Sequence, residues 1–261
     1  MSNFRFSWLV KNLFFFFFFA MHKSFIVPVT IYYESLCPDS AKFITEQVYP
    51  AVKAELNEHV DITWVPFGKS SVSEIKQYQT LTHILYSTQG AEVTFNCHHG
   101  PNECYGNKVH ACAIEHIQAN SYQTEFTRES LTLDFIHCMM KAGKNFPDNV
   151  YPGARCAREN HINTWENIQT CANSTEGSQL LKKQGDATNQ FQLPLANVPT
   201  VVFKQQFDPN VNERAMTNFL GTICQYVSQP QPKICASGNG AVSIAIAPML
   251  GLLVFAVSRL F

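Results

Sequence analysis

Residues 26–66 decide the fold, and they read IVPVTIYYESLCPDSAKFITEQVYPAVKAELNEHVDITWVP. The β-branched and aromatic run at 26–33 predicts a strand, and Pro28 indicates that its first half lies at a sheet edge or at the strand start. A second run of the same character, at 60–65, predicts another strand that ends at Pro66. Two strands are therefore expected within this short stretch.

The segment between these strands predicts a helix. From 41 to 48 the apolar residues recur three and four positions apart, and 52–56 prolong this pattern after a kink at Pro50. Strand, helix and strand in this order favour a parallel βαβ unit. The turn at Cys37 would then lie at the carboxyl end of the first strand, where α/β proteins place their sites.

The sequence changes character after residue 68. The stretch 69–190 is polar and helix-permissive, and six of the nine cysteines lie in it. Apolar spacings predict short helices at 112–117 and 131–140. Short helices with little apolar surface need covalent support, which the six cysteines can supply as disulfides. We therefore expect a cysteine-rich helical insertion here.

Strand signals return after this insertion. The stretch 197–203 predicts a turn into a buried strand, and 212–227 predicts a last helix. We expect 25–68 and 191–235 to form the first and second parts of one α/β domain, which the insertion interrupts.

Composition excludes two classes of protein. The chain has 261 residues, of which 46% are hydrophobic and 15% charged, with 19 Lys and Arg against 20 Asp and Glu. Such a balance argues against a polybasic nucleic-acid binder, and the low charged fraction argues against disorder in most of the chain.

Both ends carry targeting features. Residues 1–20 contain two cations, then a short hydrophobic block with six consecutive phenylalanines, which predicts a secretory signal peptide. Residues 241–257 carry no charge, and they predict either a single membrane span or the signal for a glycolipid anchor. We therefore expect a secreted or luminal protein that is attached to a membrane through this tail.

An oxidising compartment fits two further observations. Asn173 begins an Asn-Ser-Thr glycosylation acceptor. Cysteines are normally paired in such a compartment, and nine is an odd number, so one free thiol is expected.

Cys37 is the candidate for that free thiol. It falls at the expected start of a helix, with Pro38 at the favoured first helical position. The positive end of a helix stabilises an anion, and the thiolate is the form that attacks disulfides. Ser40 stands where a dithiol motif has its second cysteine, and its hydroxyl can donate a hydrogen bond to the thiolate but cannot resolve a mixed disulfide.

Pro199 is the second candidate of the site. A proline before a buried strand, after a long insertion, predicts a cis peptide bond near the reactive cysteine. The backbone of Val198 would then be exposed for strand-like pairing with a substrate peptide.

Residues 97–112, CHHGPNECYGNKVHAC, combine three cysteines with three histidines. That composition suggests zinc, but no Cys-x-x-Cys pair is present and the compartment favours disulfides, so we expect no metal and no cofactor. The positions Cys97, His99, Gly100, Glu103, Cys104, Asn107 and Cys112 resemble the signature of the gamma-interferon-inducible lysosomal thiol reductase family, whose members usually have glutamine at the position of His98. The segments around Cys37 and Pro199 resemble that family as well.

The resemblance implies a thioredoxin-like fold with a helical insertion, and reduction of protein disulfides in the lysosome or elsewhere in the secretory pathway. It carries the family's first redox cysteine onto Cys37, its second onto Ser40, and its cis-proline onto Pro199. It also implies a pair between the last two of the eight other cysteines, which are Cys97, Cys104, Cys112, Cys138, Cys156, Cys171, Cys224 and Cys235.

We therefore predict a thiol-disulfide oxidoreductase that acts on protein disulfides through Cys37. An external thiol, or a thiol of the substrate, would resolve the mixed disulfide. The alternative is a non-catalytic luminal or cell-surface module that keeps the scaffold and binds proteins.

Overall fold

The computed structural model describes four stretches of the chain, which are 26–75, 92–119, 125–143 and 151–238. The expected signal peptide at 1–20 and the expected hydrophobic tail at 241–257 lie outside these residues. Within the described stretches, none of the helices has both the length and the apolar character needed to cross a membrane.

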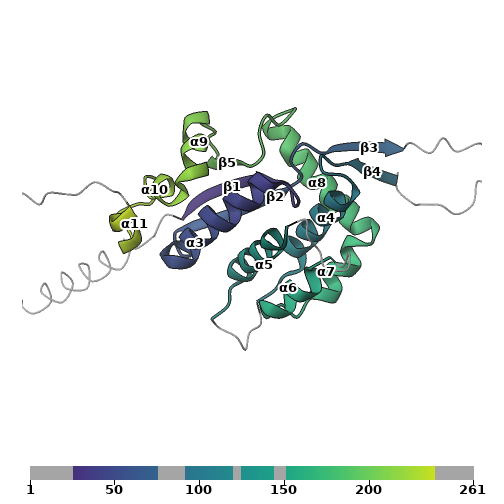
Figure 1. Ribbon diagram of the computed structural model, residues 1–261, viewed down its shortest axis with the longest axis horizontal. Helices are drawn as coiled ribbons and strands as arrows, with labels where there is room; N and C mark the ends of the chain where they lie inside the picture. Colours follow the sequence, from purple (N-terminus) through teal and green to yellow (C-terminus); the bar gives the residue numbers. More distant parts are fainter. Residues whose placement is uncertain (1–25, 76–91, 120–124, 144–150, 239–261) are drawn as a thin grey trace, which may run out of the picture.

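A three-stranded sheet forms the centre of the molecule, with the strand order β2–β1–β5 (Figure 1). The middle strand β1 (Val27–Tyr33) pairs in parallel with β2 (Val60–Pro66). On its other side it pairs antiparallel with β5 (Thr200–Phe203), beginning at Val29. Pro28 therefore precedes the part of β1 that pairs on both sides, which agrees with its expected place at the strand start.

A continuous helical run connects β1 to β2, and it contains α2 (Pro38–Phe43), the π-helical turn η1 (Ile44–Val48), α3 (Tyr49–Ala51) and a second π-helical turn η2 (Val52–Leu56). Pro50 lies in α3, between the two π-helical turns. Proline lacks an N–H and cannot take part in the regular helical ladder, which explains the irregular hydrogen bonding on either side of it. The expected parallel βαβ unit is confirmed.

The insertion begins with a hairpin that sequence reasoning missed. Strands β3 (Ser71–Ile75) and β4 (Glu92–Asn96) pair antiparallel, so the expectation of a purely helical insertion is wrong for this part. The sequence of β3, SVSEI, has only two apolar residues, Val72 and Ile75, and it lacks the regular alternation that predicts a half-buried strand. Its pattern therefore does not distinguish it from the polar stretch around it.

In the described part of the insertion, the hairpin is followed by five helices, which are α4 (Pro101–His116), α5 (Arg128–Ala142), α6 (Gly153–Glu159), α7 (Trp165–Ala172) and α8 (Thr175–Phe191). The helix expected at 112–117 is the end of the longer α4, and the helix expected at 131–140 lies within α5. These helices share a hydrophobic cluster that is separate from the core around the sheet. It lies between α4, α5, α6 and α7 and includes Phe135, Ile168 and two disulfides.

The last part of the chain contains α9 (Pro209–Thr217), α10 (Phe219–Ile223) and α11 (Lys233–Gly238). The expected single helix at 212–227 is wrong, because Asn218 ends α9 and caps α10. Its side-chain oxygen accepts a hydrogen bond from the Gly221 N–H at 2.9 Å. An asparagine that caps a helix start interrupts the helix although the apolar spacing continues through it.

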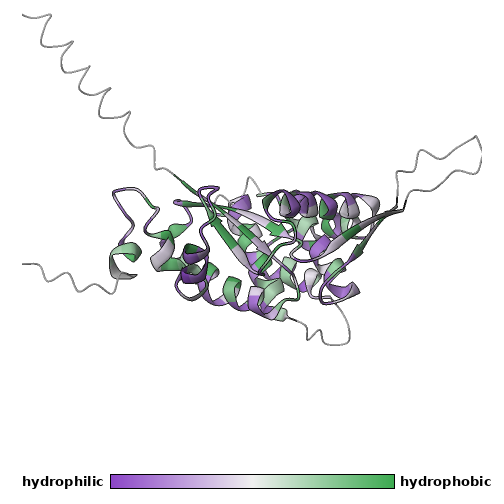
Figure 2. Cartoon of the chain, turned by 90° about the horizontal axis from the view of Figure 1, so that it is seen from above, coloured by the Kyte–Doolittle hydropathy of each residue, from purple (hydrophilic) through white to green (hydrophobic). Residues whose placement is uncertain are grey.

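The main core lies between the sheet and the helices that cover it. Ile31 and Tyr33 of β1 are fully buried, and Phe219 of α10 contacts both Phe43 and Phe203. Figure 2 shows hydrophobic residues on the strands of the central sheet, and both hydrophilic and hydrophobic residues on the helices around it. The expected α/β class is confirmed, and the insertion is held by disulfides and is helical apart from the β3–β4 hairpin.

Candidate active site

Cys37 lies at the start of the helical run that follows β1. Its backbone is extended, and Pro38 occupies the first helical position. The Cys37 carbonyl accepts a hydrogen bond from the Ala41 N–H at 2.9 Å, which begins the helix, and the Cys37 N–H donates to the carbonyl of Glu34 at 3.3 Å. The residue is a free cysteine and only 7% exposed. Its sulfur is therefore reactive only toward molecules that can reach an enclosed position.

A cavity of about 400 Å³ adjoins Cys37. Its walls come from the turn around Cys37, the first helical turns that follow it, and the end of α5. The lining residues are Ser35, Leu36, Cys37, Pro38, Ala41, Lys42, Thr45, Glu46, Met140, Lys141 and Gly143. The lining combines apolar side chains with charged ones, which suits a polypeptide segment better than a purely apolar ligand.

Ser40 is fully buried on the first turn of α2. Its hydroxyl oxygen accepts a hydrogen bond from the N–H of Glu34 at 3.4 Å. This bond uses the oxygen as an acceptor, so the hydroxyl hydrogen is still able to donate to a Cys37 thiolate. The position that the sequence resemblance assigns to a second redox cysteine is thus occupied by a buried hydroxyl group.

Val198 and Pro199 directly precede β5, and the peptide bond between them is cis. Thr200, the next residue, pairs with Tyr32 near the carboxyl end of β1. Pro199 therefore lies at the end of the sheet from which the chain continues to Cys37. Val198 is half-buried, and its side chain packs against the small cluster of Tyr32, Val65, Leu195 and Val202.

All eight remaining cysteines form disulfides. The pairs are Cys97–Cys104, Cys112–Cys171, Cys138–Cys156 and Cys224–Cys235. Three of them lie within the insertion, and the last connects the end of α10 to α11. No cysteine of the segment 97–112 keeps a thiolate for a metal ion, so the cysteine-based zinc site considered from the sequence does not form.

The motif at 97–112 holds the segment that leads to Cys37. Asn107, which is fully buried on α4, accepts a hydrogen bond from the Ser35 N–H through its Oδ1 at 2.9 Å. The Ser35 hydroxyl donates to the carbonyl of Glu103, one turn earlier on the same helix, at 3.2 Å. Two hydrogen bonds from α4 thereby fix a residue that lies two positions before the candidate nucleophile.

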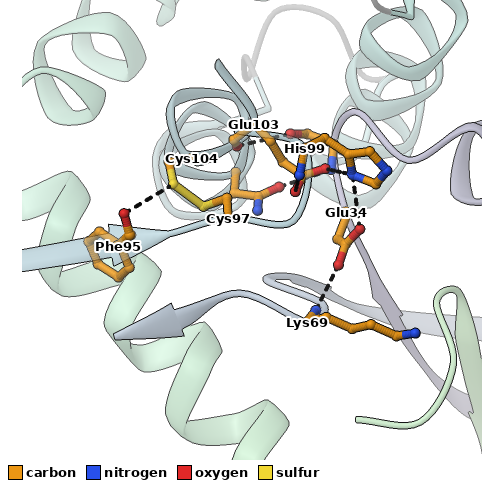
Figure 3. Close-up of a disulfide and its surroundings, with 9 residues drawn as sticks. Glu34, Lys69, Phe95, Cys97, His99, Glu103 and Cys104 are labelled. Atoms are coloured by element: carbon orange, nitrogen blue, oxygen red, sulfur yellow. Dashed lines mark hydrogen bonds and ion pairs between the residues drawn. A yellow bond between two sulfur atoms is a disulfide. The ribbon is translucent and has the colours of Figure 1, made fainter. Parts of the chain in front are cut away.

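Glu34 was not singled out by sequence reasoning, yet it lies at the centre of this region (Figure 3). Its carboxylate accepts a hydrogen bond from the Lys69 N–H at 2.7 Å and lies beside the side chains of His98 and His99. Gly68 has a φ of 61°, and a Cβ atom there would collide with the Glu34 side chain. Burial raises the pKa of Glu34, the Lys69 N–H lowers it, and the neighbouring charge of Glu103 raises it further.

The carboxylate of Glu103 contacts the loop before α4 at His99. It accepts a hydrogen bond from the His99 N–H at 2.9 Å, and its other oxygen lies 2.6 Å from His99 Nδ1. Gly100, with a φ of 86°, caps α4, and the Cys97–Cys104 disulfide closes the loop around it. No feature of the sequence indicates that Glu34 meets this loop, because 64 residues separate it from His98.

A second buried polar contact lies nearby, between β1 and α4. The hydroxyl of Tyr33 lies 3.0 Å from Nδ1 of His110, and both side chains are fully buried. Burial lowers the pKa of His110 to about 3. His110 is therefore a neutral part of the core throughout the physiological pH range.

Asn173 lies in the connection between α7 and α8, and it is exposed. Its side-chain nitrogen donates to the carbonyl of Gln169 at 2.8 Å. Glycosylation of this residue stays a prediction.

Comparison with known proteins gives concordant results. The family model described as gamma interferon inducible lysosomal thiol reductase (GILT) matches residues 28–160. The chain is 67% identical over 227 residues to GILT-like protein 1 of Drosophila melanogaster, and this alignment covers 87% of the chain and 85% of the fly protein. It is 48% identical over 236 residues to the gamma-interferon-inducible lysosomal thiol reductase-like protein of Anopheles gambiae, and this alignment covers 90% of the chain and 91% of the mosquito protein.

Among solved structures, oxidised BdbD from Bacillus subtilis superimposes with a TM-score of 0.43 at 12% sequence identity, which covers 73% of this chain and 82% of that chain.

Proposed function

The chain belongs to the gamma interferon inducible lysosomal thiol reductase family, and from this premise we propose that it is a thiol-disulfide oxidoreductase that works through Cys37 alone. The observation that carries the proposal is the contrast between two buried positions on one helical turn. Cys37 is the free cysteine at the start of α2, while Ser40 fills the place of a second redox cysteine. The family supports the class of reaction, and this contrast supports the particular mechanism.

The proposed reaction has two exchange steps. The Cys37 thiolate attacks one sulfur of a substrate disulfide, a bond forms between these two sulfurs, and the other substrate sulfur leaves as a thiolate. A second thiol then attacks the mixed disulfide and releases Cys37. When this thiol is a small molecule, a further molecule of it completes the reaction, so one substrate disulfide is reduced and two external thiols are oxidised. When it is the substrate's own second thiol, the disulfide re-forms or is rearranged.

The surroundings of Cys37 support a protein substrate. A disulfide in a polypeptide has to enter with flanking backbone, and the cavity of about 400 Å³ beside Cys37 has room for such a segment. The backbone at Val198 precedes β5 at the same end of the sheet, where an extended substrate chain can pair with it as an added strand. Pro199 fixes the direction of the chain at that point.

The proposed location is the lysosome or the cell surface, reached through the secretory pathway. Four disulfides support an oxidising compartment. Membrane attachment through 241–257 is part of this proposal, and Asn173 is its proposed glycosylation site. Release of the protein from membranes by a phospholipase that cleaves glycolipid anchors would support that anchor, whereas retention after this treatment would favour a membrane span.

Reduction of insulin by excess small thiol tests the mechanism. The wild-type protein is expected to accelerate the reaction, and Cys37→Ser is expected to abolish that acceleration while it leaves the melting temperature nearly unchanged. Ser40→Cys is expected to raise turnover several-fold, because a resolving thiol is then present on the same turn.

The alternative, a binding module without turnover, predicts a different result. Wild-type protein and Cys37→Ser would then give the same background rate and bind reduced and oxidised substrate equally. Equal rates for these two proteins, both shown to be folded, would refute the proposed mechanism.

A further inference from the structure

We propose that Glu34, His98 and His99 form a binding site for a divalent transition-metal ion, with Zn²⁺ as the best match. The site is separate from the thiol chemistry of Cys37. Its ligands come from two segments that are distant in the sequence, which are the end of β1 and the loop before α4. Figure 3 shows the side chains of Glu34 and His99 turned toward each other.

The distances fit a tetrahedral metal ion. One oxygen of Glu34, Oε2, lies 3.3 Å from His98 Nδ1 and 3.2 Å from His99 Nδ1. Zinc binds histidine nitrogen and carboxylate oxygen at about 2.0–2.1 Å, so two ligand atoms of a tetrahedral site lie about 3.3 Å apart. The ligand atoms of all three residues lie within 4.8 Å of one another. A small ion can therefore be placed among them with little movement of the side chains.

The negative charges in this region favour the binding of a cation. Glu34 and Glu103 are two fully buried carboxylates whose charges interact. Within the described residues, the ion pairs of both carboxylates are with histidines and with no lysine or arginine. The contact of Lys69 with Glu34 is made by its backbone N–H. Buried carboxylates need a compensating partner, and a divalent ion bound to neutral histidines supplies one.

The burial of the three ligands forms a gradient. The side chain of Glu34 is fully buried, that of His99 is 19% exposed and that of His98 is 55% exposed. Such a site has three protein ligands and one open side, where water completes the coordination. Glu103 accepts a hydrogen bond from the His99 N–H at 2.9 Å, which holds the backbone of this ligand in place. The other oxygen of Glu103 lies 2.6 Å from His99 Nδ1, the atom that would bind the ion, so metal binding would replace this side-chain contact.

His98 is the residue to test, because it is the most exposed ligand and its loss leaves the core intact. The amide of glutamine is a much poorer zinc ligand than imidazole, so His98→Gln removes one ligand with little change in side-chain size. His116→Gln is the matched control. His116 also lies beside a glutamate, Glu176, at 2.8 Å, but the third residue there, Cys171, is held in a disulfide.

The experiment uses protein with its four disulfides intact, in a Cys37→Ser background, so that the free thiol cannot bind the metal. After treatment with a chelator, binding of Zn²⁺ is followed by calorimetry and binding of Co²⁺ by its visible absorption. We expect one ion per chain and a tetrahedral Co²⁺ spectrum. His98→Gln is expected to weaken binding about tenfold or more, and His116→Gln to leave it unchanged.

A second measurement does not depend on the spectrum. Zn²⁺ is expected to raise the melting temperature of the background protein and of the His116→Gln variant, but not of the His98→Gln variant, because binding to the folded state alone stabilises it. The proposal is overturned if no stoichiometric ion binds, or if His98→Gln and His116→Gln affect binding equally. Neither result depends on whether the protein reduces disulfides.

Discussion

Replacing Asn107 by alanine removes the hydrogen bond through which α4 holds the segment before Cys37. The side chain of Asn107 is fully buried, and its Oδ1 accepts from the Ser35 N–H at 2.9 Å. Alanine offers no acceptor, so the buried N–H of Ser35 loses its partner, at a cost of about 1–3 kcal/mol. In a domain of this size, a loss of about 2 kcal/mol lowers the melting temperature by about 4–8 °C.

The assay that isolates this hydrogen bond is amide hydrogen exchange. In Asn107→Ala the Ser35 amide is expected to exchange much faster, while the amides in the middle of β1 change only with the global stability. Asn210→Ala, a substitution of an exposed residue on α9, is the control and should change the stability by less than about 0.5 kcal/mol. At a temperature where all variants are folded, Asn107→Ala is also expected to reduce insulin more slowly.

Unchanged exchange at Ser35, together with the expected loss of stability, would refute this reasoning. Asn107 would then stabilise α4 in some general way and would not position the turn at Cys37. A slower reaction with an unchanged Ser35 amide would lead to the same conclusion.

Three further predictions follow from other parts of the structure. His110 has a pKa of about 3 in the folded protein and an ordinary pKa in the unfolded chain, so the unfolded chain binds more protons and the free energy of unfolding falls below about pH 6.5. In denaturant titrations, the wild-type protein should lose about 2 kcal/mol of this free energy between about pH 7 and pH 5, and the His110→Gln variant should not. Gly185→Ala should destabilise the fold by about 1–3 kcal/mol, because its Cβ would lie 2.7 Å from the ring of Phe67, whereas the neighbouring exposed Asp186→Ala should have little effect in the same melts. Asn173→Gln should remove one glycan from protein made in a eukaryotic secretory pathway, as measured by mass spectrometry, and an unchanged mass would contradict the proposed modification.

The first part of the fold could be predicted because its pattern is local. The strands β1 and β2 are rich in β-branched and aromatic residues, and the helix between them has an apolar stripe. Such a pattern indicates which residues of one helix or strand are buried, and it requires no knowledge of the other elements. Pro38 at the helix start could be predicted for the same reason, since helix starts have their own residue preferences. The free thiol of Cys37 was predicted from the odd number of cysteines.

What could not be predicted depends on contacts between distant segments. The hairpin β3–β4 is polar, and its pairing is visible only when the strands are side by side. Asn218 divides the last predicted helix because its side chain caps α10, although an asparagine within an apolar stripe is also common on exposed helix faces. Glu34 was missed because its partners His98 and His99 reach it only after the insertion has folded.

The motif at 97–112 shows how these two kinds of information combine. Glu103 and Asn107 are four positions apart, so a helix places them on one face, and this much follows from spacing. That the face contacts Ser35, two residues before Cys37, follows only from the structure. All three cysteines of the motif are in disulfides, and two of its residues bond to the turn that leads to Cys37.

The contacts of Ser40 show why serine at this position is compatible with the fold. Its hydroxyl is fully buried and bonded to the Glu34 N–H, a contact that needs only a small acceptor at this position. Cysteine has nearly the same shape and differs by a somewhat larger atom, so Ser40→Cys should fit with little strain. A second thiol would then lie on the same helical turn as Cys37. The architecture around the turn is thus compatible with a dithiol, and in the proposed mechanism the restriction to one thiol comes from a single oxygen atom in place of sulfur.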